Sequence, residues 1–363
     1  MEGVGVEPEF WRGRRVLLTG HTGFKGSWLA LWLESLGAEV VGLSKGLPTT
    51  PSLFELARVS DGVPSLKADI RDPQAVERAL ADSTPEVVIH MAAQSLVGRA
   101  FEQPVETYAT NVMGTVHVLD AARRSERVRV IVNVTTDKCY ENREWVWGYR
   151  EHEPMGGYDP YSSSKGCAEL VTAAFRSSYA QGEEAPAIAS ARAGNVIGGG
   201  DWARDRLVPD LMKAVVEGRA AVIRNPDAIR PWQHVLNPLS GYLTLAQALW
   251  GSHEHAEAWN FGPEDADVRP VRWMIDRLSE AWGEPIAWRR DERETPHEAQ
   301  YLKLDSSKAR VRLGWAPTWA LSDALTSIAA WYKTLRSGGD LRRHALDQIA
   351  AFQAGDPPPE AGS

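Results

Sequence analysis

The chain has 363 residues, of which 43% are hydrophobic and 24% charged, and its formal net charge at pH 7 is −8. This composition is typical of a folded globular protein, and it excludes a disordered chain, a fibrous chain and a disulfide scaffold. An acidic chain also has no overall electrostatic attraction to nucleic acid. Two cysteines, Cys139 and Cys167, are too few for a stapled secreted fold, so we expect reduced thiols in a cytoplasmic protein.

The two ends of the chain are polar. Residues 1–15 contain acidic side chains and no apolar stretch, unlike a secretory signal peptide. We expect residues 1–9 and the proline-rich residues 354–363 to be disordered. The apolar runs between them are too short and too often interrupted by charge to span a bilayer. The 15 tryptophans are expected mainly to pack in the core, although some could line a cleft.

Apolar strand-like segments alternate with helix-like segments through the first half of the chain. The predicted strands are 15–19, 39–43, 86–90, 128–134 and 187–191, and the predicted helices are 26–36, 73–81, 115–124 and 160–179. Continuous apolar strands that alternate with helices predict a doubly wound α/β fold with a parallel sheet covered on both faces. A ligand of such a fold binds at the carboxyl ends of the strands.

The pattern changes after Asn195, where glycines and prolines become more frequent. Helices are predicted at 207–217, 238–250, 271–282 and 321–334. We therefore expect two units. The first is a dinucleotide-binding Rossmann domain at 11–191, to which 228–262 returns, and the second is a smaller substrate lobe at 192–227 and 263–350.

A glycine-rich turn follows the first predicted strand. Its sequence is G-x-x-G-x-x-G, and the residues expected at the cofactor are Gly20, Thr22, Gly23, Phe24, Lys25 and Gly26. Glycines here let the backbone approach a diphosphate, to which the following helix offers N–H donors. The second strand ends in Ser44 and Lys45, without the carboxylate expected to hold a ribose, so these residues leave NAD and NADP both open. Asp69 and Ile70 are expected at the adenine, but Asp69 could instead cap the next helix.

A phenol and an ammonium lie four residues apart on one predicted helix face, at Tyr161 and Lys165. A cation beside a phenol favours the phenolate, which brings tyrosine toward the range of a general base. Thr136 follows the strand predicted at 128–134, so its hydroxyl is expected in the same cleft. A tyrosine–lysine pair alone is commonplace on helices. Its combination with the glycine turn and a hydroxyl just after that strand is specific.

This combination resembles the extended short-chain dehydrogenase/reductases, and the resemblance covers residues 11–335. It implies hydride chemistry on a nucleotide sugar, with Thr136, Tyr161 and Lys165 as catalytic residues and Lys165 also at the nicotinamide ribose. Ala92 and Ala93 match the superfamily's cofactor contacts. Gln94 and Asn111 are expected near the substrate and in support of the active site.

Asp137 and Lys138 distinguish between branches of this superfamily. A 4-epimerase needs only the threonine, tyrosine and lysine, whereas a 4,6-dehydratase needs a further acid and base beside the threonine. The dTDP-glucose and GDP-mannose dehydratases have glutamate at the second position, so Lys138 departs from them. The pair resembles the CDP-glucose 4,6-dehydratases, as do residues 20–26, 48–54, 192–202 and 230–235.

The resemblance implies a dehydration of CDP-glucose that uses NAD without net consumption. Tyr161 would remove the C4 hydroxyl proton, Lys138 the C5 proton, and Asp137 would donate a proton to the leaving C6 hydroxyl. The hydride taken from C4 would return to C6 and give a 4-keto-6-deoxy sugar. The alternative interpretation makes Asp137 and Lys138 a surface salt bridge of little energetic value.

Four further residues are expected at the substrate: Asn195, Arg206, Arg230 and Trp232. The arginines suit a diphosphate, although Asn195 could instead cap a loop and Trp232 could pack in the core. The segment 253–255, His-Glu-His, lacks further ligands and is interpreted as a solvated loop, so no metal site is predicted.

Two rival functions remain open. One is a 4-epimerase or a 4,6-dehydratase for another nucleotide sugar, and the other is a non-catalytic NAD-sensing protein, which would typically lack the tyrosine–lysine pair. The resemblance also implies a homodimer or homotetramer, with a four-helix contact formed by 111–124 and 160–179. No nucleic-acid or membrane partner is expected.

Overall fold

The computed structural model describes residues 5–182, 184–291 and 301–361. Its largest element is a seven-stranded sheet in the order β11-β6-β5-β4-β1-β2-β3, and every neighbouring pair of strands is parallel. The strands are β1 (Arg15–Thr19), β2 (Glu39–Ser44), β3 (Ser65–Lys67), β4 (Val87–His90), β5 (Val130–Val134), β6 (Ala187–Arg192) and β11 (Ala258–Asn260). The doubly wound α/β fold is therefore confirmed. The strand order reverses between β1 and β4, which is the ligand-binding position of such folds.

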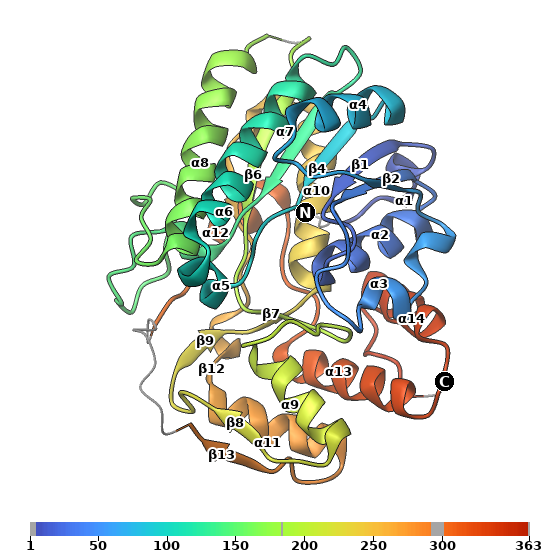
Figure 1. The fold of residues 1–363 in the computed structure, drawn as a ribbon, viewed down its shortest axis with the longest axis vertical. Coiled ribbons are helices and arrows are strands. Elements are labelled where there is room, and N and C mark those ends of the chain that lie inside the picture. The colour runs from blue at the N-terminus through green and yellow to red at the C-terminus, as the bar shows by residue number, and fades with distance from the viewer. Residues whose placement is uncertain (1–4, 183, 292–300, 362–363) are drawn as a thin grey trace.

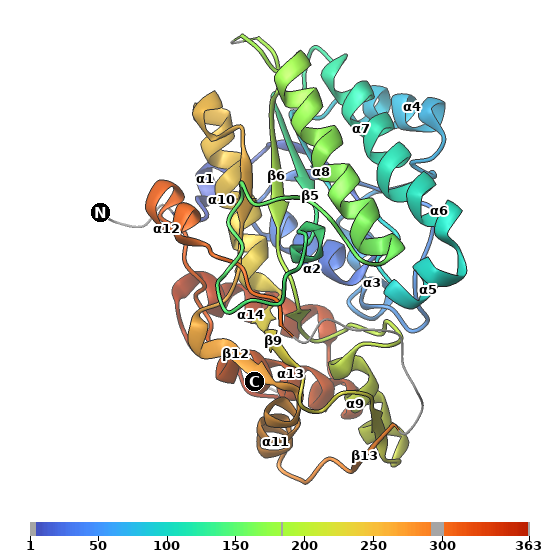
Figure 2. The same ribbon diagram turned by 90° about the vertical axis from the view of Figure 1, so that its left-hand side faces the viewer.

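Helices cover both faces of the sheet (Figures 1 and 2). One face packs against α4 (Pro73–Ser83), α7 (Gly114–Arg123) and α8 (Pro160–Tyr179), and the other packs against α2 (Phe24–Ser35) and α10 (Leu236–Gly251). Successive strand side chains divide between these layers: Leu17 lies in the first core, while Val16 and Leu18 lie in the second. This period of two is what a strand buried on both faces requires.

Short helices complete the sheet domain. They are α1 (Pro8–Trp11), α3 (Leu53–Leu56), α5 (Val97–Glu102), α6 (Pro104–Tyr108) and α12 (Ser307–Leu313), with single turns η1 (Val59–Asp61), η2 (Ala109–Met113), η3 (Asp137–Cys139) and η4 (His253–His255). The turn η2 is π-helical and continues into α7. The His-Glu-His segment forms η4, and the described residues contain no cluster of three or more side chains suited to a metal.

The lower lobe in Figure 1 carries the remaining elements. They are β7 (Val196–Ile197), α9 (Leu207–Glu217), β8 (Ala221–Ile223), β9 (Ile229–Pro231), β10 (Gln233–His234), η5 (Asp265–Asp267), β12 (Val268–Pro270), α11 (Val271–Trp282), β13 (Trp288–Arg290), α13 (Leu321–Arg336) and α14 (Leu341–Ala354). Their strands form three two-stranded pairs: β7 with β10, β8 with β13, and β9 with β12. No helix in the described parts of the chain is long and apolar enough to cross a membrane.

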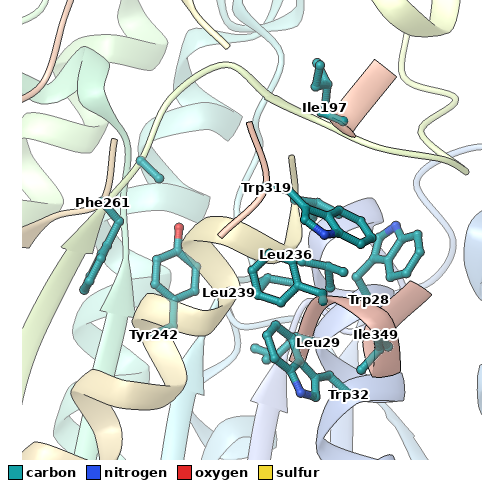
Figure 3. Packing of buried hydrophobic residues seen from close by; sticks show 14 of the residues in the cluster. Trp28, Leu29, Trp32, Ile197, Leu236, Leu239, Tyr242, Phe261, Trp319 and Ile349 are labelled. Carbon is teal, nitrogen blue, oxygen red and sulfur yellow. The ribbon is translucent and has the colours of Figure 1, made fainter. Parts of the chain in front are cut away.

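A tryptophan-rich core joins the two lobes (Figure 3). Trp28 and Trp32 of α2 are fully buried, and the Trp32 ring meets Phe352 of α14 edge to face. Trp319 packs on the same phenyl ring and donates its indole N–H to the carbonyl of Asp356. The expectation that tryptophans mainly fill the core holds here. These contacts fix α2, the helix that begins at the glycine turn, against the C-terminal helices.

The chain ends differ from the expectation of disorder. At the N-terminal side, Glu7 donates its backbone N–H to Gln247, which in turn donates to the carbonyl of Gly5. At the other end Ala354 closes α14, and Asp356 accepts the bond from Trp319. Disorder was therefore wrong for these residues, because buried partners from α10 and the lobe hold them. Residues 1–4 and 362–363 lie outside the described residues.

Candidate active site

A cavity of about 1160 Å³ opens at the carboxyl ends of β1, β4, β5 and β6, and residues of both lobes line it. One end lies at the glycine turn and the end of β2. The centre is lined by the ends of β5 and β6 and by the start of α8, and the far end is lined by α9 and β8. A cavity of this size can hold two nucleotide-sized ligands.

The glycine turn between β1 and α2 has no room for side chains. Gly20 has a φ of +77°, and a Cβ atom there would lie 2.8 Å from the backbone nitrogen of Ala92. A Cβ on Gly26 would lie 2.1 Å from the carbonyl oxygen of Gly20. The N-cap residue of α2 is Gly23, so the first N–H groups of the helix face the cavity without a capping side chain. This arrangement suits a bound diphosphate.

Thr19 organises the segment that faces this turn across the sheet. Its hydroxyl lies 2.7 Å from Nδ1 of His90 and accepts hydrogen bonds from the backbone of Met91 and Ala92, both at 3.1 Å. Ala92 and Ala93 consequently line the cavity, as expected of cofactor contacts. Sequence reasoning missed Thr19 and His90, although both are polar residues at the ends of buried strands.

The end of β2 provides hydroxyls where a carboxylate was expected. The Thr22 and Ser44 hydroxyls lie 2.7 Å apart, and both donate to the carbonyl of Gly46. Lys45 pairs with Glu106 at 3.2 Å, and Glu106 also binds Arg99 at 2.9 Å. Two cations at this edge therefore share the one carboxylate of Glu106.

Asp69 and Ile70 both line the cavity. The Asp69 carboxylate binds Arg71 through two side-chain nitrogens, and this hydrogen bonding lowers the pKa of Asp69. The next helix, α4, is capped by Asp72, which accepts from the backbone of Gln74 and Ala75. The capping role considered for Asp69 therefore belongs to Asp72.

Thr136, Tyr161 and Lys165 meet at the centre of the cavity, and all three are buried. Asp159 caps α8 by accepting from the backbone N–H groups of Tyr161 and Ser162, which fixes the first turn of that helix. Lys165 of the same helix donates to the carbonyl of Val134 at 3.3 Å.

The electrostatics of this pair differ from the expectation. Burial raises the pKa of Tyr161 to about 12, and the hydrogen bond with Thr136 only partly opposes this. Burial lowers the pKa of Lys165 to about 8. In the protein alone, desolvation therefore outweighs the effect that a neighbouring ammonium has on the phenol. The phenolate needs further positive charge in the cavity.

Asp137 is buried at the end of β5. Its Oδ1 atom accepts from the Thr136 hydroxyl at 2.9 Å, whereas Oδ2 has no hydrogen-bond partner among the described residues. A Cβ on Gly194 would overlap Oδ2, so this glycine leaves the carboxyl its space. Burial raises the pKa of Asp137, which favours the neutral acid. The surface salt bridge considered for Asp137 and Lys138 is wrong, because Asp137 is buried and no ion pair joins the two within the described chain.

Lys138 is partly buried beside Asp137 in η3 and lines the cavity. Asn111 supports the neighbouring helix, since its amide donates to Ser164 of α8 at 2.8 Å and to the carbonyl of Gln94 at 2.9 Å. Gln94 lines the cavity, but its side chain bonds within the protein, to Leu96 and Thr107.

Asn195, Arg206, Arg230 and Trp232 line the cavity, whereas Asn111, also predicted near the substrate, is not among its lining residues. Arg206 pairs with Asp201 at 2.9 Å, and Arg230 is buried with its charge near Asp137. Trp232 is buried and donates to the carbonyl of Arg269, so it forms both cavity wall and core. Asn195 has a φ of +46° and accepts a backbone bond from Gln233, which is a loop-shaping role.

Two buried features escaped sequence reasoning. Lys25, inside the glycine turn, donates to the Tyr242 hydroxyl at 2.7 Å, and burial lowers its pKa to about 7. Glu169 of α8 pairs with Arg192 of β6 at 2.7 Å beneath Thr135. Glu169 lies four residues after Lys165 on the predicted helix face, and this spacing was the available signal.

Comparison with known proteins gives consistent matches. The family model described as GDP-mannose 4,6-dehydratase matches residues 17–328. The chain is 52% identical to a CDP-glucose 4,6-dehydratase of Salmonella typhimurium, over 95% of this chain and 99% of that protein.

Solved structures match at lower identity. A dTDP-glucose 4,6-dehydratase of Streptomyces venezuelae, solved with NAD bound, has a TM-score of 0.77 at 24% identity over 90% of this chain and 99% of its own. An epimerase of Methanothermobacter thermautotrophicus has a TM-score of 0.79 at 22% identity over 94% of this chain and 97% of its own. At these identities the structural matches establish the fold.

Proposed function

The chain belongs to the GDP-mannose 4,6-dehydratase family, and from this premise we propose that it dehydrates CDP-glucose to CDP-4-keto-6-deoxyglucose with NAD as a recycled cofactor. The observation that carries the proposal is Asp137, a buried carboxyl with one oxygen free of partners in the described chain, beside Thr136 and Tyr161. A simple epimerisation at C4 has no use for such an acid. The 52% identity to a CDP-glucose 4,6-dehydratase supports the choice of nucleotide.

The residues around the glycine turn fit NAD. The crowded backbone at Gly20 and Gly26 leaves the start of α2 open to a diphosphate. At the end of β2 the carboxylate of Glu106, which Lys45 and Arg99 share, opposes the extra phosphate of NADP and so favours a ribose bearing two hydroxyls. When bound, NAD would accept a hydride at one stage of the reaction and return it at a later stage. Tyr161 and Lys165 are the residues that would hold its nicotinamide ribose.

The side chains at the centre of the cavity divide the proton transfers among them. Tyr161, as phenolate, removes the proton of the C4 hydroxyl while Thr136 hydrogen-bonds the same oxygen. Lys165, with a pKa of about 8, is mostly an ammonium at pH 7 and stabilises the phenolate. Oxidation at C4 acidifies the C5 proton.

Elimination uses the second pair of residues. Lys138 removes the C5 proton, and neutral Asp137 donates a proton to the C6 hydroxyl, which leaves as water. Hydride return to C6 and reprotonation at C5 complete the 4-keto-6-deoxy sugar. The product differs from the substrate by one water, so no net oxidation occurs. Arg206 and Arg230 bind the substrate diphosphate.

The chain is proposed to act as two units, 11–191 with 228–262 for the cofactor and 192–227 with 263–350 for the nucleotide sugar. A cytoplasmic location is supported by its two cysteines, which are both free.

The function is tested by incubating the purified protein and NAD⁺ with CDP-glucose, dTDP-glucose and GDP-mannose in separate reactions. We expect loss of 18 mass units from CDP-glucose alone. Water loss from another sugar nucleotide would contradict the nucleotide assignment, and inversion at C4 without water loss would contradict the reaction.

Lys25 gives a prediction about cofactor binding. Its ammonium is buried within electrostatic reach of Lys165 and Asp137, and its pKa is about 7. A positive charge here opposes the cationic nicotinamide of NAD⁺. Lys25→Ile should therefore raise NAD⁺ affinity about tenfold at pH 6.5, and the wild-type affinity should rise as the pH increases through 7. Titration of tryptophan fluorescence with NAD⁺ between pH 6 and 8.5 measures both effects. A variant whose affinity and pH dependence match those of the wild type would contradict this role.

A second prediction concerns self-association. Val105, Tyr108, Met113 and Leu170 are exposed apolar residues on α6, η2 and α8, and Val105 is 81% exposed. We propose that this face contacts a second copy of the chain, since exposed apolar surface of this kind marks interfaces. Val105→Asp should convert a dimer into a monomer in sedimentation velocity, while Val311→Asp, at an equally exposed valine of α12, should not. A Val105→Asp protein that sediments as the wild type would contradict the assigned face.

A further inference from the structure

The far end of the cavity contains a carboxylate that the proposed mechanism does not use. This end is lined by α9 and β8, beyond Arg206, and Leu207, Val222 and Ile223 give it apolar walls. Asp210, from the first turn of α9, lines this end between these walls, and Asp205, Arg224 and Asn225 also line the cavity. Apolar walls with a few oriented polar groups are the usual surroundings of a planar ligand.

Asp210 is half-buried, and its carboxylate makes no hydrogen bond or ion pair with any residue in the described ranges. Burial and the neighbouring carboxylate of Asp205 raise its pKa to about 6, while Arg224, Lys213 and Arg219 act in the opposite direction. Asp210 is therefore mostly ionised at pH 7.5. Its oxygens are free to accept hydrogen bonds from a ligand.

The position of Asp210 limits what can bind beside it. A substrate with its sugar at Tyr161 and its diphosphate at Arg206 has only its nucleoside left to fill the cavity toward β8. A carboxylate repels a phosphate, so the group at Asp210 must be a neutral hydrogen-bond donor. The base of a nucleotide sugar meets this condition when it carries an exocyclic amine.

We propose that Asp210 selects the base of the substrate by accepting a hydrogen bond from the 4-amino group of cytosine. Uracil and thymine present an oxygen at the same position, and two acceptors facing each other repel. Discrimination would thus combine an attraction to one base with a repulsion of the others. This inference rests on the proposed function, because it assumes a CDP-sugar substrate.

Binding of CDP and of UDP tests the assignment without turnover. The two ligands differ only at the edge of the base, so the ratio of their affinities isolates its recognition. We expect the wild-type protein to bind CDP about 10 to 100 times more tightly than UDP at pH 8. Asp210→Asn should bring this ratio close to one, because an amide can accept from the amine of cytosine or donate to the oxygen of uracil.

Asp205→Asn is the matched control. It removes a neighbouring negative charge without touching the proposed acceptor, so it should keep the preference for CDP. Isothermal titration calorimetry of the three proteins, with their folding checked by thermal melting, gives the ratios. An Asp210→Asn variant that retains the wild-type ratio of CDP to UDP affinity would overturn the assignment. So would an Asp205→Asn variant in which this ratio falls as close to one as it does in Asp210→Asn.

The wild-type protein alone supplies a second measurement. Protonated Asp210 can donate to the oxygen of uracil, so the preference for CDP should shrink between pH 8 and pH 5.5. A preference that stays constant over this range would also overturn the assignment. Failure of the proposed function is distinguishable, because it would show as turnover of a different sugar nucleotide by the unaltered protein, whatever the Asp210 variants do.

Discussion

Lys138→Met should lower the rate of water loss from CDP-glucose by about 10²- to 10⁴-fold, which is the usual contribution of a general base. Lys138 lies in η3 directly after the buried acid Asp137 and lines the same cavity as Tyr161. The methionine side chain fills a similar space but cannot accept a proton from C5. Oxidation at C4 uses Thr136 and Tyr161, so it should survive. The 4-keto sugar should then accumulate without loss of water.

Three measurements separate these steps. Mass spectrometry follows water loss, absorbance at 340 nm follows oxidation at C4 in a single turnover, and deuterium uptake at C5 in D2O follows proton removal. Lys67→Met, at an exposed lysine of β3 outside the cavity, controls for the loss of one positive charge. Asp137→Asn should also block water loss, but C5 exchange should persist because the base remains. Undiminished dehydration by Lys138→Met would remove Lys138 from the mechanism.

Arg192→Met should reduce the free energy of unfolding by about 3–5 kcal/mol, which is typical when one partner of a buried ion pair is removed. Arg192 of β6 donates to Glu169 of α8 at 2.7 Å, and both side chains are almost fully buried. Glu169 also accepts hydrogen bonds from Thr135 and Ser190. Without the guanidinium, the Glu169 carboxylate would be left in the core without a counter-charge.

Chemical denaturation of three variants measures this loss in the free energy of unfolding. Replacing both partners in Arg192→Met/Glu169→Met should restore part of the stability, since no charge is then left unpaired. Arg312→Met, which breaks an exposed pair with Glu257, should change the stability by less than about 1 kcal/mol. An Arg192→Met protein as stable as the Arg312→Met protein would contradict this account of the core.

The ion pair of Arg192 and Glu169 also predicts that the stability of the protein depends on pH. Burial raises the pKa of Glu169, but Arg192 and the hydrogen bonds outweigh burial and hold it below its ordinary value of 4.5. A carboxylate with a depressed pKa in the folded state contributes stability that is complete above its unfolded pKa. This contribution is lost as the pH falls through the folded pKa. The difference in stability between the wild type and the double variant should accordingly narrow below about pH 4.5.

Local sequence pattern was sufficient for five of the seven strands of the sheet and for the centre of the site, but the short edge strands β3 and β11 were not predicted. The β-branched strands and the capped helix at 160–179 are local signals, and they bring Thr136 and Tyr161 to one cavity. The helix α14 was missed although Leu341, Ala345 and Ile349 repeat at helical spacing and Asp340 caps it.

Other features depend on contacts between distant segments. Nothing near Asp137 in the sequence indicates that Gly194, more than fifty residues later, leaves space for its carboxyl. The partner of Lys25 is Tyr242 on α10, and the partner of Glu169 is Arg192 on another strand. The raised pKa of Tyr161 likewise follows from burial by the whole fold, which a spacing of four residues to Lys165 does not reveal.

The most direct test of the central claim is the fate of a deuterium label at C4 of CDP-glucose. If one site oxidises C4, eliminates water and returns the hydride, the product should be lighter by 18 mass units and should carry the deuterium at C6. Retention of the deuterium at C4 in an unaltered or inverted sugar would contradict the account, and so would its complete loss to solvent. Either result would remove dehydration with internal hydride return as the function of this protein.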